Sequence, residues 1–281
     1  MENKALPYLL LLPTAVFLCL FFLYPFSLVA WQAFVGDNGF TLEHFRSMTD
    51  HWKFSISFWN TMLLAVAVVP IQLILSIVMA SMVNAMRKGR DIVLYIWTIP
   101  LGISDLAAGI IWLAIFEQSG FLNSMLQSIG VADKPQNFLT YDNLWTIFLA
   151  IALAEIWRAT AIMFVILVAG MGLIPKEYNE AAEVFGASRW QRLWRITLPL
   201  LRPSLQTALI LRVILAFEVF AVVAALGGTS FPVLMGETYN YQFALQDGHV
   251  AAALALVILA VSIAFTLVII RVLRVPKEAQ I

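Results

Sequence analysis

The stretch Glu180-Ala181-Ala182-Glu183-Val184-Phe185-Gly186, which runs on to Ile196-Thr197-Leu198-Pro199, is the longest markedly polar segment of an apolar sequence. The chain has 281 residues, of which 62% are hydrophobic and 12% are charged, whereas a soluble domain has about 25% charged residues. This excess of apolar side chains, which include 20 Phe and 9 Trp, needs a lipid environment. The composition therefore predicts an integral membrane protein, and the polar stretch must leave the membrane.

Six apolar segments are long enough to cross a membrane, since a transmembrane helix needs roughly 20 mostly apolar residues. They cover approximately residues 6–34, 58–86, 92–116, 144–173, 203–226 and 250–273. Pro100 is expected to bend the third helix. No long linker divides the chain, so we predict an all-α, polytopic protein with a single domain, 1–281, in which the polar segment 175–199 joins the fourth and fifth helices.

The first apolar segment, 6–34, has a signal peptide as its alternative interpretation, because Lys4 precedes it. Its apolar run is longer than the about 7–15 residues of a signal-peptide core, and no clear cleavage site follows. We therefore expect an uncleaved membrane helix.

Lys and Arg residues are distributed unevenly between the two sides of the predicted helices. One side has only Arg46, Lys53 and Lys134. The other side has a much larger set, namely Lys4, Arg87, Lys88, Arg90, Lys176, Arg189, Arg192, Arg195, Arg202, Arg271, Arg274 and Lys277. Because Lys and Arg accumulate in cytoplasmic loops, we expect the segment 175–199 and both termini to be cytoplasmic.

Several classes of function lack their usual residues in this sequence. There is no G-x-x-x-x-G-K-[ST] phosphate loop, so the chain is not expected to bind ATP in that manner. Cys19 is the only cysteine, which excludes an internal disulfide or a multi-cysteine metal site. His44, His51 and His249 fall in or beside outer loops, so no catalytic or metal site is expected. The net charge is zero, so nothing indicates nucleic-acid binding. An intramembrane enzyme or a passive channel stays as an alternative function of a different class from transport.

Ionisable residues within the predicted helices indicate a functional site, because a charge at the bilayer centre costs at least about 2.5–3.5 kcal/mol. Asp105 is expected near the middle of the third helix and Arg212 near the middle of the fifth. Glu155 and Arg158 lie near the middle of the fourth helix and share one face of it. These four charged residues and Ser104 form the predicted solute path, because carboxylates and guanidinium groups make several directed hydrogen bonds to hydroxyl-rich solutes. The alternative is a set of ion pairs that only hold the helices together.

The polar segment has the residues of a helical hairpin at the membrane surface. Pro175 suits the first turn of a helix, and Gly186 permits the left-handed turn that ends it. Ala181 and Ala182 keep this helix slim, so a groove of another protein can approach its backbone. A second, amphipathic helix follows, with Trp at the level of the lipid and Arg toward water.

This segment resembles the EAA signature of binding-protein-dependent ABC importer permeases, of the carbohydrate branch. All seven fixed positions match at the right spacing, namely Glu180, Ala181, Ala182, Gly186, Ile196, Leu198 and Pro199. The likeness continues at Asn60-Thr61, at residues 174–178 and at Leu226-Gly227-Gly228. The overall pattern is similar to the first permease subunit of the maltose and multiple-sugar importers.

The resemblance implies a type I ABC importer permease fold, a place in the plasma (inner) membrane of a bacterium or an archaeon, and a set of partners. Glu180, Ala181, Ala182, Phe185 and Gly186 would form a coupling helix that docks on a separate ABC ATPase, present in two copies, which would carry the ATP and Mg. A second, homologous permease would complete the membrane part, and an extracytoplasmic solute-binding protein would deliver a sugar or glycoside. The same machinery for another solute, such as glycerol phosphate, a polyamine or an anionic sugar, stays as the alternative.

Two positions depart from the common form of the family. Phe185 stands where many relatives have Asp, and Thr229 stands where a Pro often follows the Gly pair. The coupling contact at Phe185 is therefore expected to differ from that of these relatives.

Overall fold

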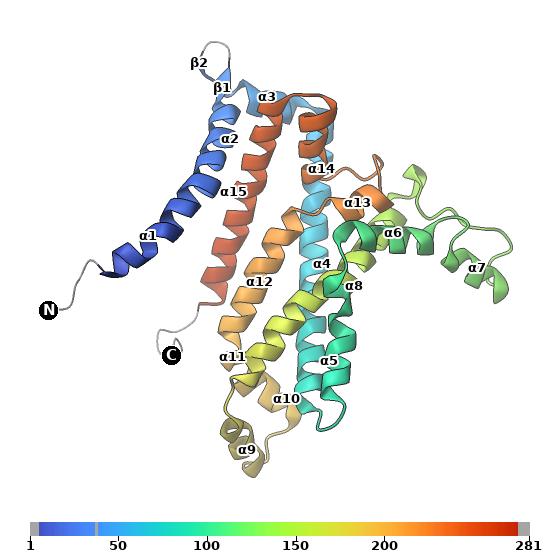
Figure 1. The fold of residues 1–281 in the computed structure, drawn as a ribbon. Helices are drawn as coiled ribbons and strands as arrows, with labels where there is room; N and C mark the ends of the chain where they lie inside the picture. Colours follow the sequence, from blue (N-terminus) through green and yellow to red (C-terminus); the bar gives the residue numbers. More distant parts are fainter. Residues whose placement is uncertain (1–5, 37–38, 275–281) are drawn as a thin grey trace. The chain divides into compact units, whose positions relative to one another are not determined.

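The computed structural model describes residues 6–36 and 39–274 of the chain. Lys4 and Lys277, which contribute to the predicted charge bias, lie outside the described residues. The chain divides into two compact units, residues 1–55 with 234–259 and residues 56–233 with 260–281. We describe each unit by itself (Figure 1).

The first unit begins with a long apolar helix made of three successive parts. They are α1 (Leu6–Leu18), a π-helical turn η1 (Cys19–Leu23) and α2 (Tyr24–Phe34). A short antiparallel hairpin of β1 (Val35–Gly36) and β2 (Gly39–Phe40) follows, and then α3 (Glu43–Asp50). Between Tyr8 and Phe34 only Ala33 is fully buried. The apolar side chains of this helix therefore require lipid or another protein around them.

The other elements of the first unit are α14 (Leu234–Tyr239), the π-helical turn η5 (Asn240–Ala244) and the first half of α15 (Gly248–Val272). The rings of His44 and His249 stack with centroids 4.7 Å apart. One nitrogen of each ring lies within 2.9 Å of a backbone carbonyl oxygen. These two histidines are thus held by packing and backbone contacts, and among the described residues no group of three or more His, Cys, Asp or Glu residues is arranged to hold a metal ion.

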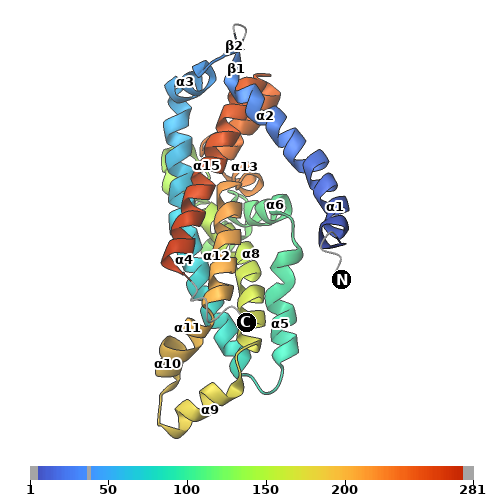
Figure 2. The same cartoon turned by 90° about the vertical axis from the view of Figure 1, so that its left-hand side faces the viewer.

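The second unit contains the remaining helices (Figures 1 and 2). Its long helices are most of α4 (Trp52–Ala85), which begins in the first unit, and α8 (Leu144–Gly172). The shorter elements are α5 (Arg90–Thr98), η2 (Ile99–Gly102), α6 (Asp105–Phe116), α7 (Phe121–Ser128), η3 (Tyr141–Asn143), α9 (Lys176–Val184), α10 (Arg189–Arg192), η4 (Leu193–Thr197), α11 (Leu198–Leu200), α12 (Arg202–Phe217), α13 (Ala221–Leu226) and the end of α15.

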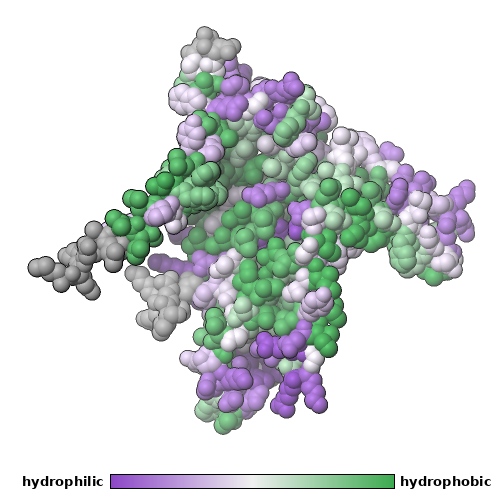
Figure 3. All heavy atoms as spheres, viewed as in Figure 1, coloured by the Kyte–Doolittle hydropathy of each residue, from purple (hydrophilic) through white to green (hydrophobic). Residues whose placement is uncertain are grey.

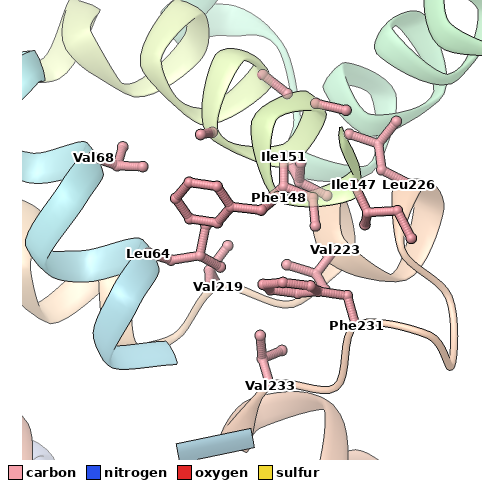
Figure 4. Packing of buried hydrophobic residues seen from close by; sticks show 14 of the residues in the cluster. Leu64, Val68, Ile147, Phe148, Ile151, Val219, Val223, Leu226, Phe231 and Val233 are labelled. Atoms are coloured by element: carbon pink, nitrogen blue, oxygen red, sulfur yellow. The ribbon is translucent and has the colours of Figure 1, made fainter. Parts of the chain in front are cut away.

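Two apolar clusters form the core of the second unit. One packs α4, α6, α8 and α13 around Leu64, Phe148, Ile151 and Val223 (Figure 4). The other packs α4, α8 and α12 around a set that includes Val83, Phe164, Leu167 and Leu205. On α8, Glu155 and Arg158 lie between the residues of the two clusters, and on α12, Arg212 follows the residues of the second cluster.

The membrane-crossing helices agree with the predicted fold class. Five helices of the described residues are long and apolar enough to cross a membrane, and a sixth span results if Arg189–Leu200 and Arg202–Phe217, bent by 72°, count as one. The segment 203–226, predicted as one helix, ends its regular part at Phe217, and α13 follows as a separate helix. In Figure 3, apolar side chains cover much of the second unit, while polar side chains gather at its end around α9 and α10.

Candidate functional site

The third predicted helix, 92–116, is interrupted just before Asp105. Pro100 lacks an N–H group, and the chain passes through the 3-10 turn η2 into an extended backbone at Ser104. The Oγ of Ser104 accepts a hydrogen bond from the Ala107 backbone N–H at 3.2 Å, which caps the start of α6. Asp105 is therefore the first residue of α6, and its predicted place near the middle of a helix was wrong.

An ion pair joins this helix start to α8. The Nη1 of Arg158 lies 2.8 Å from Oδ1 of Asp105, and the side chain of Asp105 is 45% exposed whereas that of Arg158 is 12% exposed. Ser104 beside them is exposed as well. This end of the site is therefore open to a molecule outside the chain.

A second ion pair joins α8 to α12 and is closed. The Nη2 of Arg212 lies 2.8 Å from Oε2 of Glu155, and the two residues are only 2% and 3% exposed. The other oxygen of Glu155 lies 3.8 Å from Nη2 of Arg158. The structure thus brings together all four predicted charged residues, in the order Asp105, Arg158, Glu155 and Arg212, and their formal charges cancel.

Gln72 on α4 is a fifth member of this site that the sequence analysis missed. Its Oε1 accepts a hydrogen bond from Nε of Arg212 at 2.5 Å, and its Nε2 donates to the backbone oxygen of Glu155 at 2.7 Å. Gln72 is fully buried. The available signal was a polar amide in an apolar helix, two residues after Pro70, where an unpaired polar group would be costly.

The closed end of the site has almost no free space. A cavity of about 10 Å³ borders Glu155 and Arg212, and its other lining residues are Leu64, Val68, Ala216 and Val219. Such a volume holds about one water molecule. Glu155 and Arg212 therefore do not contact a sugar-sized molecule in this conformation.

Aromatic side chains of α6 and α8 lie against one another. The ring of Trp112 on α6 lies 6.2 Å from that of Trp157 on α8 and 5.8 Å from that of Phe116. Trp157 directly precedes Arg158 and is exposed. Trp112 and Phe116 also pack against the apolar cluster around Phe148, so these rings help to hold α6 on α8.

The predicted hairpin is formed by α9 and α10 at one end of the second unit (Figure 2). Gly186 has φ +75° and the backbone N–H of Ala187 bonds to the Ala182 carbonyl at 2.9 Å, so α9 ends in a Schellman turn. Ser188 and Gln191 then form a reciprocal capping box that starts α10. Arg192 forms an ion pair with Glu183, which ties the two helices together.

The hairpin exposes large apolar side chains instead of covering them. Phe185 is 89% exposed and Val184 is 86% exposed. Glu180 and Ala181 are also exposed, while Ala182 is half-buried. Apolar residues that project from a polar hairpin are typical of a protein interface.

The apolar helices, the charged site on them and the exposed hairpin together are those of a polytopic membrane transport subunit. The sequence profile described as "Binding-protein-dependent transport system inner membrane component" matches residues 72–277. The chain belongs to this family and is a permease subunit of an ABC importer, as the resemblance of residues 180–199 predicted.

Similar proteins cover nearly the whole chain. The trehalose/maltose transport system permease protein MalF of Thermococcus litoralis is 30% identical, over 99% of this chain and 96% of its own length. The sulfoquinovosyl glycerol transport system permease protein SmoG of Agrobacterium fabrum is 30% identical, over 97% of this chain and 91% of its own. In a bacterial ABC transporter involved in the import of the acidic polysaccharide alginate, one chain superposes with a TM-score of 0.83 at 24% identity, covering 97% of this chain and 96% of that chain. This structural likeness confirms the predicted fold.

Proposed function

We propose that this permease subunit carries a neutral sugar or glycoside through the site formed by Ser104, Asp105 and Arg158, with Glu155 and Arg212 behind it. The observation that supports this solute class is the charge balance of the site. Two carboxylates and two guanidinium groups cancel, so a charged solute would bring an unpaired charge into a poorly solvated place. Hydroxyl groups can instead share hydrogen bonds with both kinds of side chain.

The names of the relatives agree with a sugar or polyol solute, but they divide on its charge, because sulfoquinovosyl glycerol carries a sulfonate and glycerol 3-phosphate a phosphate. MalF is named for trehalose and maltose and SmoG for sulfoquinovosyl glycerol, while UgpA of Agrobacterium fabrum, 27% identical, is named for sn-glycerol-3-phosphate. A glycerol phosphate or another charged solute therefore stays as the alternative for the same machinery.

The second part of the proposal concerns the motor. The segment Glu180 to Gly186 serves as the coupling helix, on which an ABC ATPase docks and transmits the closure that ATP drives. Two ATPase copies, a second permease and a solute-binding protein complete the importer. Both termini and the hairpin then lie on the cytoplasmic side, in accordance with the Lys and Arg bias.

Uptake by the reconstituted importer tests the solute class. The complex of both permeases and the ATPase is placed in liposomes with its binding protein and ATP, and four radiolabelled probes are compared: maltose, trehalose, glycerol 3-phosphate and spermidine. We expect uptake of a neutral sugar only. Uptake of glycerol 3-phosphate or spermidine in preference to both sugars would overturn the solute class, and uptake by this chain alone without ATPase would indicate a channel.

Cysteine labelling tests the sidedness of the hairpin. Because Cys19 is the only cysteine, the change Cys19→Ser gives a background in which Glu183→Cys is the single thiol. A membrane-impermeant maleimide is expected to label this thiol in inverted vesicles and not in intact cells. Lys134→Cys is the matched control and should show the opposite pattern.

A further inference from the structure

Gln72 connects the two members of the buried ion pair. Its amide oxygen lies 2.5 Å from Nε of Arg212, and its amide nitrogen lies 2.7 Å from the backbone oxygen of Glu155. One side chain of α4 therefore sets the position of Arg212 on α12 relative to Glu155 on α8. No solvent reaches Gln72, which is 0% exposed, so these contacts do not compete with bulk water.

The two ion pairs of the site differ in how easily they can exchange partners. The pair Glu155–Arg212 is sealed, and the cavity beside it measures only about 10 Å³. The pair Asp105–Arg158 reaches the surface through the half-exposed carboxylate of Asp105. A solute that enters the path can therefore reach Asp105 first.

Arg158 has a second carboxylate within reach. Its Nη2 is 3.8 Å from Oε1 of Glu155, too far for a hydrogen bond. This oxygen and Nε of Arg158 are buried and make no hydrogen bond to any described residue. A movement of about 1 Å would bring Arg158 into hydrogen-bond range of Glu155. The site is thus built so that Arg158 can change from one carboxylate to the other.

We propose that Gln72 is a positioning residue of the solute path, which holds Arg212 against one oxygen of Glu155 and so reserves the other oxygen for Arg158. When solute hydroxyls take the carboxylate of Asp105, Arg158 moves to Glu155, and the ion pair between α6 and α8 opens. This inference rests on the proposed function and assigns it a solute with at least two neighbouring hydroxyls, because a carboxylate accepts hydrogen bonds on both oxygens.

Replacement of Gln72 by Met removes both contacts at nearly the same side-chain length. Arg212 then loses the acceptor of its Nε and can turn toward the free oxygen of Glu155. Arg158 is excluded from that oxygen and stays on Asp105, so the solute meets an occupied carboxylate. The importer should consume ATP while it carries less solute.

The ATP hydrolysed per solute transported is the measurement that separates this role from a structural one. It is determined in liposomes that contain the full complex, with saturating loaded binding protein and the sugar that the wild-type complex takes up. Gln72→Met and Asp105→Asn are each expected to raise this ratio about tenfold, the scale of a lost hydrogen bond to a charged group. The double variant should give no further rise, since both changes act on the same exchange.

Ser76→Ala is the matched control, because Ser76 is buried one turn along α4 and bonds to the Leu73 carbonyl of its own helix. It should keep the wild-type ratio. A wild-type ratio in Gln72→Met or in Asp105→Asn would overturn the proposal, as would effects that multiply in the double variant. If Gln72→Met does not assemble, Gln72→Asn takes its place, since it keeps the neutral amide but is one methylene too short to reach Nε of Arg212: a raised ratio supports the proposal, and a wild-type ratio overturns it.

The failure of this inference is distinguishable from failure of the proposed function. If the wild-type complex transports no neutral sugar, the proposed solute class is wrong whatever the variants do. If it transports sugar, and the Gln72 and Asp105 variants have the ATP-to-solute ratio of the wild type, the positioning role is wrong and the proposed function stands.

Discussion

The buried charged site and the hairpin of α9 and α10 are two polar regions of one apolar chain, and they differ in where their partners lie. Each charge of the buried site faces an opposite charge of the same chain. The apolar residues Val184 and Phe185 of the hairpin face outward. If the proposed function holds, the first region rearranges within this subunit, whereas the second works only against an ATPase partner.

The two regions also differ in how much free energy a lost contact involves. Removal of one partner of a buried ion pair leaves a charge without compensation and destabilises a protein by about 3–5 kcal/mol. An exposed ion pair contributes about 0.2–1 kcal/mol. The following predictions test this contrast, from the largest expected effect to the smallest.

The turn between α9 and α10 is expected to be the most sensitive position for transport. Gly186 has φ +75°, and Pro, restricted to φ near −65°, cannot adopt it. Gly186→Pro should reduce uptake by the reconstituted importer to background. Glu180→Lys, which inverts a charge of the proposed coupling helix, should have the same result.

Gly186→Asn is the control for the turn, because Asn tolerates the left-handed conformation better than other side chains. It should keep most of the uptake, and all these variants should insert into the membrane in normal amounts. Normal uptake in both Gly186→Pro and Glu180→Lys would contradict the coupling role of the hairpin.

Loss of one partner of the buried ion pair is expected to destabilise the second unit strongly. Glu155→Ala leaves Arg212 buried without its carboxylate and should lower the free energy of unfolding by about 3–5 kcal/mol. Thermal unfolding of the purified complex measures this loss. The double variant Glu155→Ala with Arg212→Ala should lose less than the sum of the two single variants, because neither charge is then left alone.

Phe185 is expected to affect assembly without affecting the stability of the subunit. Its side chain is 89% exposed, so Phe185→Ala removes almost no contact within the chain. If Phe185 is a hot spot of the ATPase interface, the loss is about 2 kcal/mol, or about 30-fold in Kd. Titration of the permease pair with purified ATPase measures this change.

Phe121→Ala is the matched control for Phe185, since Phe121 on α7 is an exposed Phe of the same unit. It should leave the ATPase affinity unchanged. An equal affinity for Phe185→Ala and the wild type would show that this position does not contribute to docking.

The pair between Glu183 and Arg192 is expected to have the smallest effect. Glu183 is mostly exposed, so Arg192→Gln should change the free energy of unfolding by less than about 1 kcal/mol. The change should shrink further at high salt. A loss as large as that of Glu155→Ala would remove the contrast between the two regions.

Much of the fold was predictable because long apolar runs have few alternatives in a membrane, where backbone groups must be satisfied within a helix. The hairpin was predictable from Pro175, from Gly186 and from the spacing of the motif. Asp105 was misplaced because a break in a helix depends on Pro100 and on the cap at Ser104 together. Gln72 was missed because one neutral amide in a long apolar helix gives no sign of its partners.

The sequence by itself determined the membrane environment, the family and the set of charged residues within the helices, since these depend on composition and on spacing along one chain. Only the tertiary structure decided which charges pair, because Gln72, Asp105, Glu155 and Arg212 lie on four different helices and their distances depend on packing. It also decided that one pair is sealed and the other is open. That division depends on how side chains fill the space between helices, which no spacing along the chain describes.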